Sequence, residues 1–166
     1  MRADKIYLVG FMAAGKSSLA REVGRRLGWS VEDVDDRIEA RERRPIAAIF
    51  ATDGEAYFRA VEREIVQELL APRHVVVATG GGTFVDPDLR ALMKADGAVF
   101  WIDAPLGQII ERLPRDGSRP LAANRTQLEG LYDARRVAYA QAHVRLDASR
   151  ASVGDLADQV LEWLGA

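Results

Sequence analysis

The feature that most constrains the fold of this chain is the sequence GFMAAGKS at residues 10–17. It fits the pattern G-x-x-x-x-G-K-[ST], which carries meaning only where a strand ends and a helix begins. Here an apolar run at residues 6–9 precedes it, and an amphipathic segment follows it. The sequence therefore predicts a phosphate-binding loop between a strand and a helix. The alternative is an ordinary glycine-rich turn with a surface lysine.

The residue types of this loop suit a nucleotide. Gly10 and Gly15 let the backbone curl so that successive N–H groups point at phosphate oxygens, and a helix beginning near Lys16 adds the positive end of its dipole. The Lys16 ammonium can reach the β- and γ-phosphates, and the Ser17 hydroxyl can ligate a Mg²⁺ ion that the phosphates also hold. We expect nucleotide contacts from Ala13, Ala14, Gly15, Lys16, Ser17 and Ser18.

Composition narrows the class of protein. The chain has 166 residues, enough for one domain with a sizeable core, and its net charge of −2 gives no electrostatic footprint for nucleic acid or an anionic membrane. Cysteine is absent, which excludes disulfides and thiol-bound metals. No apolar signal core precedes the first predicted strand, and no apolar run approaches the roughly 20 residues that span a bilayer. We expect a cytoplasmic enzyme with a small-molecule partner.

Short apolar runs alternate with helical periodicity along the chain. Strands are predicted at residues 6–9, at a short segment ending near residue 34, at 74–78, at 98–102 and, more weakly, at 144–146. Helices are predicted at 16–27, 36–43, 55–70, 87–95, 105–113, 127–142 and 152–164, with Gly28 ending the first. This alternation predicts an α/β fold with a five-stranded parallel sheet covered on both faces, whose ligands lie beyond the carboxyl ends of the strands.

Two carboxylates, Asp33 and Asp35, stand two residues apart at the end of the second predicted strand, where side chains at i and i+2 point the same way. Beside a nucleotide, one can hold magnesium through its water shell, and the other can accept a proton from, or hydrogen-bond, an attacking hydroxyl. The alternative is structural, because Asp36-x-x-Glu39 also reads as a capping box and Asp35 alone can serve as a cap.

The predicted helix at residues 55–70 has a charged face opposite its apolar stripe. Glu55, Arg59 and Glu62 share that face at positions i, i+4 and i+7. Taken alone, the face is equally well explained as a solvated series of ion pairs.

A glycine-rich segment, Thr79-Gly80-Gly81-Gly82, follows the third predicted strand. Its glycines expose backbone N–H groups with little steric bulk, so the segment can close on a hydroxyl, a carboxylate or a phosphate. The alternative is a flexible turn, but the position at the end of a buried parallel strand favours binding.

Residues 114–120, PRDGSRP, interrupt the helical pattern with proline, glycine and three charges. This composition suits a mobile flap from which Arg115 or Arg119 can bring a guanidinium onto a transferring phosphoryl group. A solvated surface loop is the alternative.

The predicted helix at residues 127–142 places an arginine among apolar residues. At about 100° per residue, Arg135 lies at the centre of the apolar stripe, whereas Arg136 lies well off it. An arginine in an inward-facing stripe needs an anion. That anion is either a structural carboxylate or a substrate carboxylate held by two parallel hydrogen bonds.

Together, and in this order, these motifs resemble those of shikimate kinase over nearly the whole chain. The matching segments are residues 10–17, Asp33-x-Asp35 with Ile38-Glu39, residues 46–50, Gly54-Glu55, Phe58-Arg59-x-x-Glu62, residues 79–82, Arg112, Arg119-Pro120, and Arg135 with Tyr139. Their joint order and spacing are specific, although no single motif is decisive. One departure is Ala13, where many members carry glycine; a stiffer loop and altered nucleotide affinity are the expected consequences.

The resemblance implies a P-loop kinase fold of three layers, in a single domain with a helical substrate-binding region at about residues 33–62 and a mobile lid at about 112–125. It implies transfer of the γ-phosphoryl group of ATP to the 3-hydroxyl of shikimate, in chorismate and aromatic amino acid biosynthesis. Mg²⁺ is the implied cofactor. The implied shikimate contacts are Asp35, Arg59, Gly80, Gly81, Gly82 and Arg135.

The same resemblance implies the catalytic roles. Lys16 and Arg119 surround the phosphoryl group, and Asp35 orients or deprotonates the hydroxyl. Asp33 supports the magnesium that Ser17 ligates. Arg112 packs near the adenine, and Arg119 closes over the phosphates.

Two alternatives remain open at this point. A P-loop kinase of another small metabolite, such as gluconate, or of a nucleoside monophosphate does not require the combined clamp of Arg59, Arg135 and the glycines. A ligand-sensing regulatory domain of the same fold is expected to carry a DNA-binding module, whereas this chain begins at its first strand and has no net basic charge. We expect a monomer, because no helix face is clearly left without an intrachain partner.

Overall fold

Five short strands form one parallel sheet in the computed structural model, which describes residues 1–113 and 124–166. The central strands are wholly buried, as their apolar sequences require, whereas the edge strand β2 is partly exposed. The predicted parallel sheet is confirmed. The strands are β1 (Lys5–Val9), β2 (Ser30–Asp33), β3 (Val75–Ala78), β4 (Ala98–Asp103) and β5 (Val144–Asp147), in the order β2-β3-β1-β4-β5.

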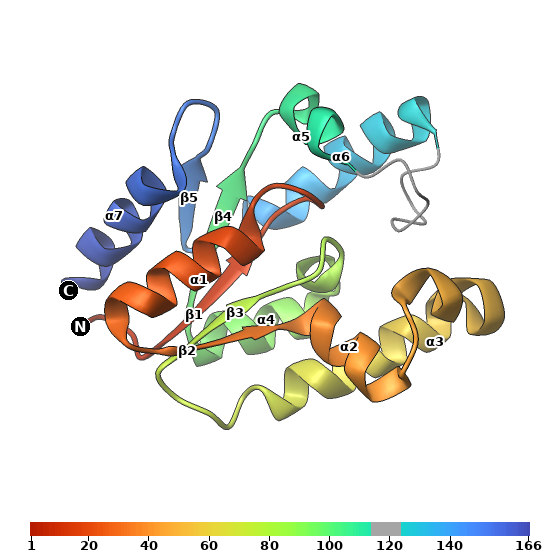
Figure 1. Cartoon of the computed structure of the whole chain (residues 1–166), viewed down its shortest axis with the longest axis horizontal. Helices are drawn as coiled ribbons and strands as arrows, with labels where there is room; N and C mark the ends of the chain where they lie inside the picture. Colours follow the sequence, from red (N-terminus) through yellow and green to blue (C-terminus); the bar gives the residue numbers. More distant parts are fainter. Residues whose placement is uncertain (114–123) are drawn as a thin grey trace.

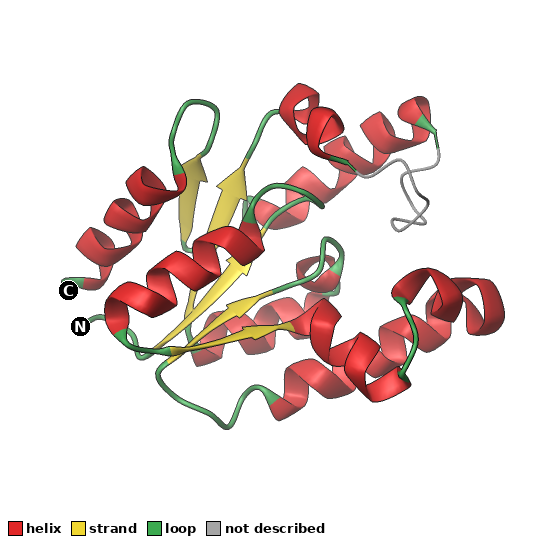
Figure 2. Ribbon diagram, viewed as in Figure 1, coloured by secondary structure: helices red, strands yellow, loops and turns green. Residues whose placement is uncertain are grey.

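Helices cover both faces of this sheet (Figures 1 and 2). On one face α1 (Lys16–Leu27) packs beside α7 (Val153–Leu164), and on the other lie α4 (Pro87–Asp96) and α6 (Arg125–Tyr139). At the carboxyl ends of β3 and β4 the chain forms the 3-10 helix η1 (Thr83–Val85) and the short α5 (Leu106–Arg112). A further pair, α2 (Val34–Glu42) and α3 (Ile46–Glu68), packs together beyond the carboxyl end of β2.

Local sequence explains where most helices begin and end. α1 follows Gly15 and ends at Gly28, whose φ of 68° lies in the left-handed region that favours glycine. α6 starts after Asn124, whose side chain accepts a hydrogen bond from the Gln127 amide, and α7 starts with a capping box at Ser152. These boundaries lie within three residues of the predicted ones.

Two helices near the predicted carboxylates, α2 and α3, start earlier than predicted for reasons that the structure explains. α2 begins at Val34 instead of residue 36, because Asp33 caps it by accepting a hydrogen bond from the Asp36 amide. α3 begins at Ile46 instead of residue 55. It consists of two helical segments joined at Gly54, where φ is 83° and ψ is 174°. A kink of this kind breaks the helical periodicity, so the sequence pattern revealed the second segment alone.

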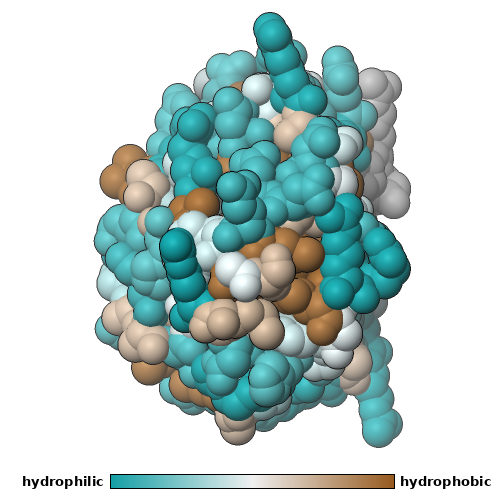
Figure 3. All heavy atoms as spheres, turned by 90° about the vertical axis from the view of Figure 1, so that its left-hand side faces the viewer, coloured by the Kyte–Doolittle hydropathy of each residue, from teal (hydrophilic) through white to brown (hydrophobic). Residues whose placement is uncertain are grey.

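Both chain termini lie at the amino ends of the strands (Figure 1), where the Arg2 amide donates to the Leu164 carbonyl at 2.9 Å. Figure 3 views the molecule from this side and shows a mainly hydrophilic surface around a small apolar area. No helix among the described residues is both long enough and apolar enough to cross a membrane. The residues that the sequence marks as functional lie at the opposite end, where the strands finish.

Candidate active site

The phosphate loop (residues 10–17) connects the carboxyl end of β1 to the start of α1. Gly10 and Gly15 have φ values of 152° and 104°, which L-residues rarely adopt. A Cβ atom at Gly10 would also meet the carbonyl oxygen of Ile102 at 2.8 Å. Ala13 has a φ of 58°, so this loop holds an alanine in the left-handed region at a cost of about 1 kcal/mol. The loop conformation thus explains why both outer positions are glycine.

Lys16, the first residue of α1, is turned back over this loop. Its ammonium donates to the carbonyl oxygens of Gly10 and Phe11 at 2.7 and 2.8 Å, and the residue is buried. These contacts fix the charge of Lys16 within the concave side of the loop, beside backbone N–H groups that can meet an anion.

Ser17 and Asp33 face each other across the start of α1 and the end of β2. The Ser17 hydroxyl donates to Asp33 Oδ2 at 2.8 Å, while Asp33 Oδ1 accepts from the Asp36 amide at 3.1 Å. The alternative reading of Asp36-x-x-Glu39 as a capping box is therefore wrong, because Asp33 is the N-cap of α2. Glu39 instead accepts a hydrogen bond from the Ile46 amide at 2.9 Å and so ties α2 to the start of α3.

A pocket of about 510 Å³ brings the phosphate loop and the two predicted carboxylates together. The strand argument for Asp35 is wrong, because Asp35 lies in the first turn of α2 and not in β2. The pocket nevertheless includes both Asp33 and Asp35. Burial raises the pKa of the neighbouring Asp36, and the charges of Asp33 and Glu39 add to this shift. The pocket is lined by Met12, Ala13, Ala14, Gly15, Lys16, Ser17, Ser18, Asp33, Asp35, Asp36, Glu39, Ile46, Thr79, Gly81 and Arg112.

The glycine loop (residues 80–82) lies against a different charged side chain at each of its three residues. A Cβ atom at Gly80 would meet Asp35 Oδ1 at 2.8 Å. One at Gly81 would meet Arg135 Nη1 at 2.9 Å, and one at Gly82 would meet Arg59 Nη2 at 2.5 Å. Each glycine therefore leaves the space that one of these side chains occupies. Three residues from α2, α3 and α6 thus converge on one loop.

Arg135 is buried, as its place in the apolar stripe of α6 predicts, and its neighbour Arg136 is not. Arg136 forms an ion pair with Asp103, which also accepts from Arg145 at 2.7 Å. The sequence-based distinction between the two adjacent arginines is confirmed. Tyr139, one turn further along α6, donates its hydroxyl proton to the Gly81 carbonyl oxygen.

The electrostatic environment of Arg135 favours an anion. Burial lowers the pKa of Arg135, and the positive charge of Arg59 adds to this effect. Within the part of the chain that the structure describes, no carboxylate lies within 4.0 Å of the Arg135 guanidinium. Arg59, by contrast, pairs with Glu62 at 2.9 Å and with Glu55 at 3.5 Å. An anion bound between the two arginines would offset the desolvation of Arg135.

Glu62 differs from the solvated face residue that the sequence allowed as an alternative. It is only 1% exposed, and its second carboxylate oxygen accepts from the Thr83 hydroxyl at 2.9 Å. The sequence placed Glu62 beside Arg59 but gave no sign of its burial, because the residues that cover it follow β3. Its i+3 spacing from Arg59 was the available signal.

The remaining predicted residues lie at or beyond the edge of this site. Arg112, the last residue of α5, lines the pocket, and its guanidinium approaches the Ala13 carbonyl oxygen at 3.5 Å. Of the residues at the glycine loop, Gly81 lines this pocket. Gly80, Gly82, Arg59 and Arg135 are not among its lining residues, and Arg135 and Arg59 lie against Gly81 and Gly82. Arg115 and Arg119, like most of the expected lid, lie outside the described residues.

Comparison of the sequence with known proteins identifies one family. The family described as shikimate kinase matches residues 12–165. A shikimate kinase from Persephonella marina is 38% identical over 157 residues, which cover 94% of this chain and 96% of that protein. A shikimate kinase from Salinibacter ruber is 37% identical and covers 98% of this chain, with 85% of its own length matched.

Comparison of the fold gives the same family and, at lower identity, other proteins of similar fold. The structure of a shikimate kinase from Acinetobacter baumannii in complex with shikimate has a TM-score of 0.92 at 32% identity, and the match covers 97% of this chain and 92% of that one. Thymidylate kinase from Candida albicans has a TM-score of 0.64 at 12% identity, a likeness of fold alone.

Proposed function

This chain belongs to the shikimate kinase family, and we propose that its two substrates meet between the phosphate loop and the glycine loop. The chain is a shikimate kinase of aromatic amino acid biosynthesis, which transfers the γ-phosphoryl group of ATP to the 3-hydroxyl of shikimate. The family match favours this activity over the two alternatives, which were a kinase of gluconate or of a nucleoside monophosphate and a ligand-sensing regulatory domain. We assign the two loops to different substrates, since they follow the adjacent strands β1 and β3 at the same edge of the sheet.

ATP binds along the phosphate loop. Backbone N–H groups of Ala13, Ala14 and Gly15 and the side chains of Lys16, Ser17 and Ser18 contact the phosphates, as their position in the pocket supports. Arg112 lies at the rim of the same pocket and packs near the adenine. Arg119 closes over the phosphates from the lid.

The oxygen atoms of Ser17 and Asp33 fit Mg²⁺. They lie 2.8 Å apart at the phosphate end of the pocket, and Mg²⁺ prefers such hard oxygen ligands. Among the described residues, no group of three or more His, Cys, Asp or Glu side chains could hold a metal. When bound, Mg²⁺ neutralises charge that develops on the phosphate oxygens.

Shikimate binds against the glycine loop, beside the phosphate end of the pocket. Arg59 and Arg135 hold its carboxylate, while Asp35 and the backbone of Gly80, Gly81 and Gly82 contact its hydroxyls. One observation carries this assignment, the convergence of Asp35, Arg59 and Arg135 on the three successive glycines. Two guanidinium groups side by side match a carboxylate, and a carboxylate near Lys16 matches a hydroxyl that must face the phosphoryl group.

Catalysis then follows from positioning and charge neutralisation. The 3-hydroxyl oxygen forms a bond to the γ-phosphorus as the bond from that phosphorus to the ADP oxygen breaks, and the hydroxyl proton passes to Asp35. Lys16 and Arg119 balance the negative charge on the transferring group. Asp35 also fixes the direction of the attacking oxygen, since its carboxylate lies against Gly80.

We propose that one monomeric domain carries out this phosphoryl transfer in the cytoplasm, where MgATP is abundant. The region at residues 33–62 binds shikimate, and the segment at 112–125 acts as the lid. The contacts between Glu39 and Ile46 and between Arg59 and Glu62 support treating α2 and the start of α3 as one substrate-binding unit.

An acceptor series tests these assignments. ADP release is measured with shikimate, the methyl ester of shikimate, gluconate and a nucleoside monophosphate in parallel. We expect turnover with shikimate, a much higher KM for the uncharged ester, and no turnover with the other two. Equal KM values for shikimate and its ester would refute the two-arginine clamp. For the metal site, Asp33→Asn is expected to raise the Mg²⁺ concentration needed for half-maximal rate.

A further inference from the structure

Thr83 occupies a position that none of these roles explains. It is the first residue of η1, directly after the glycine loop, and it is completely buried. Its hydroxyl donates to Glu62 Oε2 at 2.9 Å and accepts from the Gly80 amide at 3.0 Å. A buried hydroxyl is unfavourable unless it is hydrogen-bonded, and here both its donor and its acceptor capacity are used.

Glu62 links this hydroxyl to the substrate-binding arginine. Its Oε1 accepts from Arg59 Nη1 at 2.9 Å, and its Oε2 accepts from Thr83. Because Glu62 is 1% exposed, bulk water cannot replace either donor. The orientation of this carboxylate, and with it the direction in which Arg59 is held, therefore depends on Thr83.

Gly80 forms the other end of the chain of hydrogen bonds. In addition to the side-chain contact, the Thr83 amide donates to the Gly80 carbonyl at 3.3 Å and closes a tight turn. The point where a Cβ atom of Gly80 would lie is 2.8 Å from Asp35 Oδ1, 3.2 Å from Thr83 Oγ and 3.4 Å from Glu62 Oε2. The three side chains converge on this residue, so Thr83 connects α3 to the backbone of the glycine loop.

We propose that Thr83 is a positioning residue for the binding of shikimate. Through Glu62, Thr83 holds the Arg59 side chain in a fixed position relative to the glycine loop. The proposal rests on the proposed function in one respect, the contact of Arg59 with the shikimate carboxylate. The hydrogen bonds of Thr83 lead to Arg59 and Gly80 and not to the phosphate loop. Loss of its hydroxyl therefore weakens shikimate binding and leaves ATP binding intact.

Thr83→Val and Thr83→Ser test the proposal, because valine fills a similar volume without the hydroxyl and serine retains it. We expect Thr83→Val to raise the KM and the dissociation constant of shikimate about tenfold, with the KM of ATP within about twofold of wild type. Thr83→Ser is expected to restore the shikimate KM. Tyr7→Phe is the control for general destabilisation. It removes a hydroxyl that donates to Asp96 at 2.6 Å at the other end of the sheet.

A double variant with Arg59→Ala identifies the route. If Thr83 acts through Arg59, adding Thr83→Val to Arg59→Ala raises the shikimate KM by less than about twofold. Fully additive effects, an equal rise in both KM values, or no recovery with serine would overturn the proposal. An unchanged shikimate KM in Arg59→Ala would refute the proposed function of Arg59 as well. A raised KM in Arg59→Ala with none in Thr83→Val would refute the role of Thr83 alone.

Discussion

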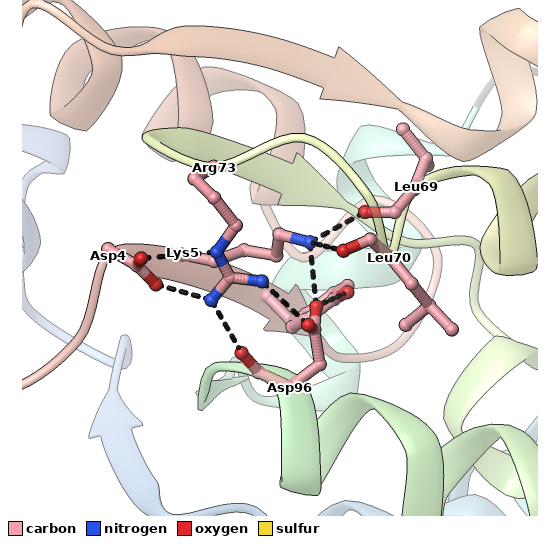
Figure 4. Close-up of polar contacts among 7 residues, drawn as sticks. Asp4, Lys5, Leu69, Leu70, Arg73 and Asp96 are labelled. Carbon is pink, nitrogen blue, oxygen red and sulfur yellow. Dashed lines mark hydrogen bonds and ion pairs between the residues drawn. The ribbon is translucent and has the colours of Figure 1, made fainter.

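Buried cations lie at both ends of the sheet, and their surroundings differ. At the amino end, Lys5 of β1 is 0% exposed. Its ammonium donates to the carbonyl oxygens of Leu69 and Leu70 at 2.7 and 2.8 Å and pairs with Asp96 at 2.7 Å (Figure 4). At the carboxyl end, Arg135 is 6% exposed. It has no carboxylate within ion-pair distance among the described residues.

The fold supplies a complete set of partners to Lys5. An ammonium has three N–H donors, and three acceptors surround this one. Burial acts to raise the pKa of Asp96, but hydrogen bonds from Lys5, Tyr7 and Arg73 outweigh it and hold the pKa below its ordinary value. Lys5 is therefore a structural cation. Arg135 is desolvated without a carboxylate partner among the described residues, which is the arrangement expected if it binds an anionic ligand as we propose, with lower stability in exchange for affinity.

The sharpest test of this contrast is Arg135→Ala. We expect the shikimate KM to rise roughly 1000-fold, equivalent to about 4 kcal/mol, because the carboxylate loses one side of its clamp. The KM of ATP should stay within about twofold. The free energy of unfolding should change by less than about 1 kcal/mol, since the cost of burying the guanidinium disappears together with its packing. Steady-state kinetics and urea denaturation measure these quantities.

Arg136→Ala is the matched control on the same helix. Asp103 keeps Arg145 as a partner in this variant, so the shikimate KM is expected to remain within about twofold of wild type. A shikimate KM that rises equally in both variants would show that α6 as a whole is disturbed, and the contrast with Lys5 would fail.

The second prediction concerns Lys5, where we expect the opposite result: a loss of stability with no change in either KM. Lys5→Met retains a long apolar stem but leaves the carbonyl oxygens of Leu69 and Leu70 without this donor, while Asp96 keeps only its hydrogen bonds from Tyr7 and Arg73. We expect the free energy of unfolding to fall by about 3 kcal/mol, because carbonyl oxygens that are shielded from water lose their hydrogen-bond donor. Both KM values, measured below the unfolding temperature, should be unchanged. A higher shikimate KM would mean that the two ends are coupled.

The sequence predicted Arg135 but not Lys5, and the reason is the range of the interactions. The phase of a helix is local, so counting along α6 was enough to place Arg135 inward and Arg136 outward. Lys5 stands at the start of an apolar run and reads as a surface residue. Its burial depends on Leu69, which is 64 residues away, and on Asp96 in α4.

The same distinction explains the errors near the active site. The phosphate loop and the glycine loop were predictable, because their glycines and their positions after strands are local features. The cap of α2 was not, because Asp33, Asp35 and Asp36 are chemically equivalent candidates and the end of β2 decides among them. The burial of Glu62 depends on Thr83, which lies 21 residues away.

Two glycine-to-alanine substitutions, one at each end of the sheet, are expected to give the same contrast with smaller effects. A Cβ atom at Gly82 would meet the movable end of Arg59, whereas one at Gly97 would meet the backbone oxygen of Lys5 at 2.8 Å. We expect Gly82→Ala to raise the shikimate KM about tenfold by displacing Arg59, with little change in stability. Gly97→Ala is expected to lower the free energy of unfolding by about 2 kcal/mol and to leave the KM unchanged, because backbone cannot move aside. An exchange of these two outcomes would invalidate the comparison.

The smallest expected effect is a pH dependence of stability at the amino end. His143 precedes β5, and its Nδ1 accepts a hydrogen bond from the Val99 amide at 3.0 Å, in place of a strand carbonyl. Burial lowers the pKa of His143, and the charge of Lys94 lowers it further. The unfolded chain therefore binds a proton at a higher pH than the folded protein does. The contribution of His143 to stability is complete above its ordinary pKa of 6.5 and declines as the pH falls below that value.

His143→Asn isolates this contribution, because an asparagine oxygen can accept the same hydrogen bond and does not titrate. Urea denaturation between pH 7.5 and 5.5, at intervals of about half a unit, should show the wild type losing stability relative to the variant as the pH falls. The difference should be small, since burial of His143 is only partial and water screens its charge. The shikimate KM should follow one pH profile in both proteins, because His143 lies at the end of the sheet away from Arg135. Parallel stability profiles would assign the pH dependence to carboxylates instead.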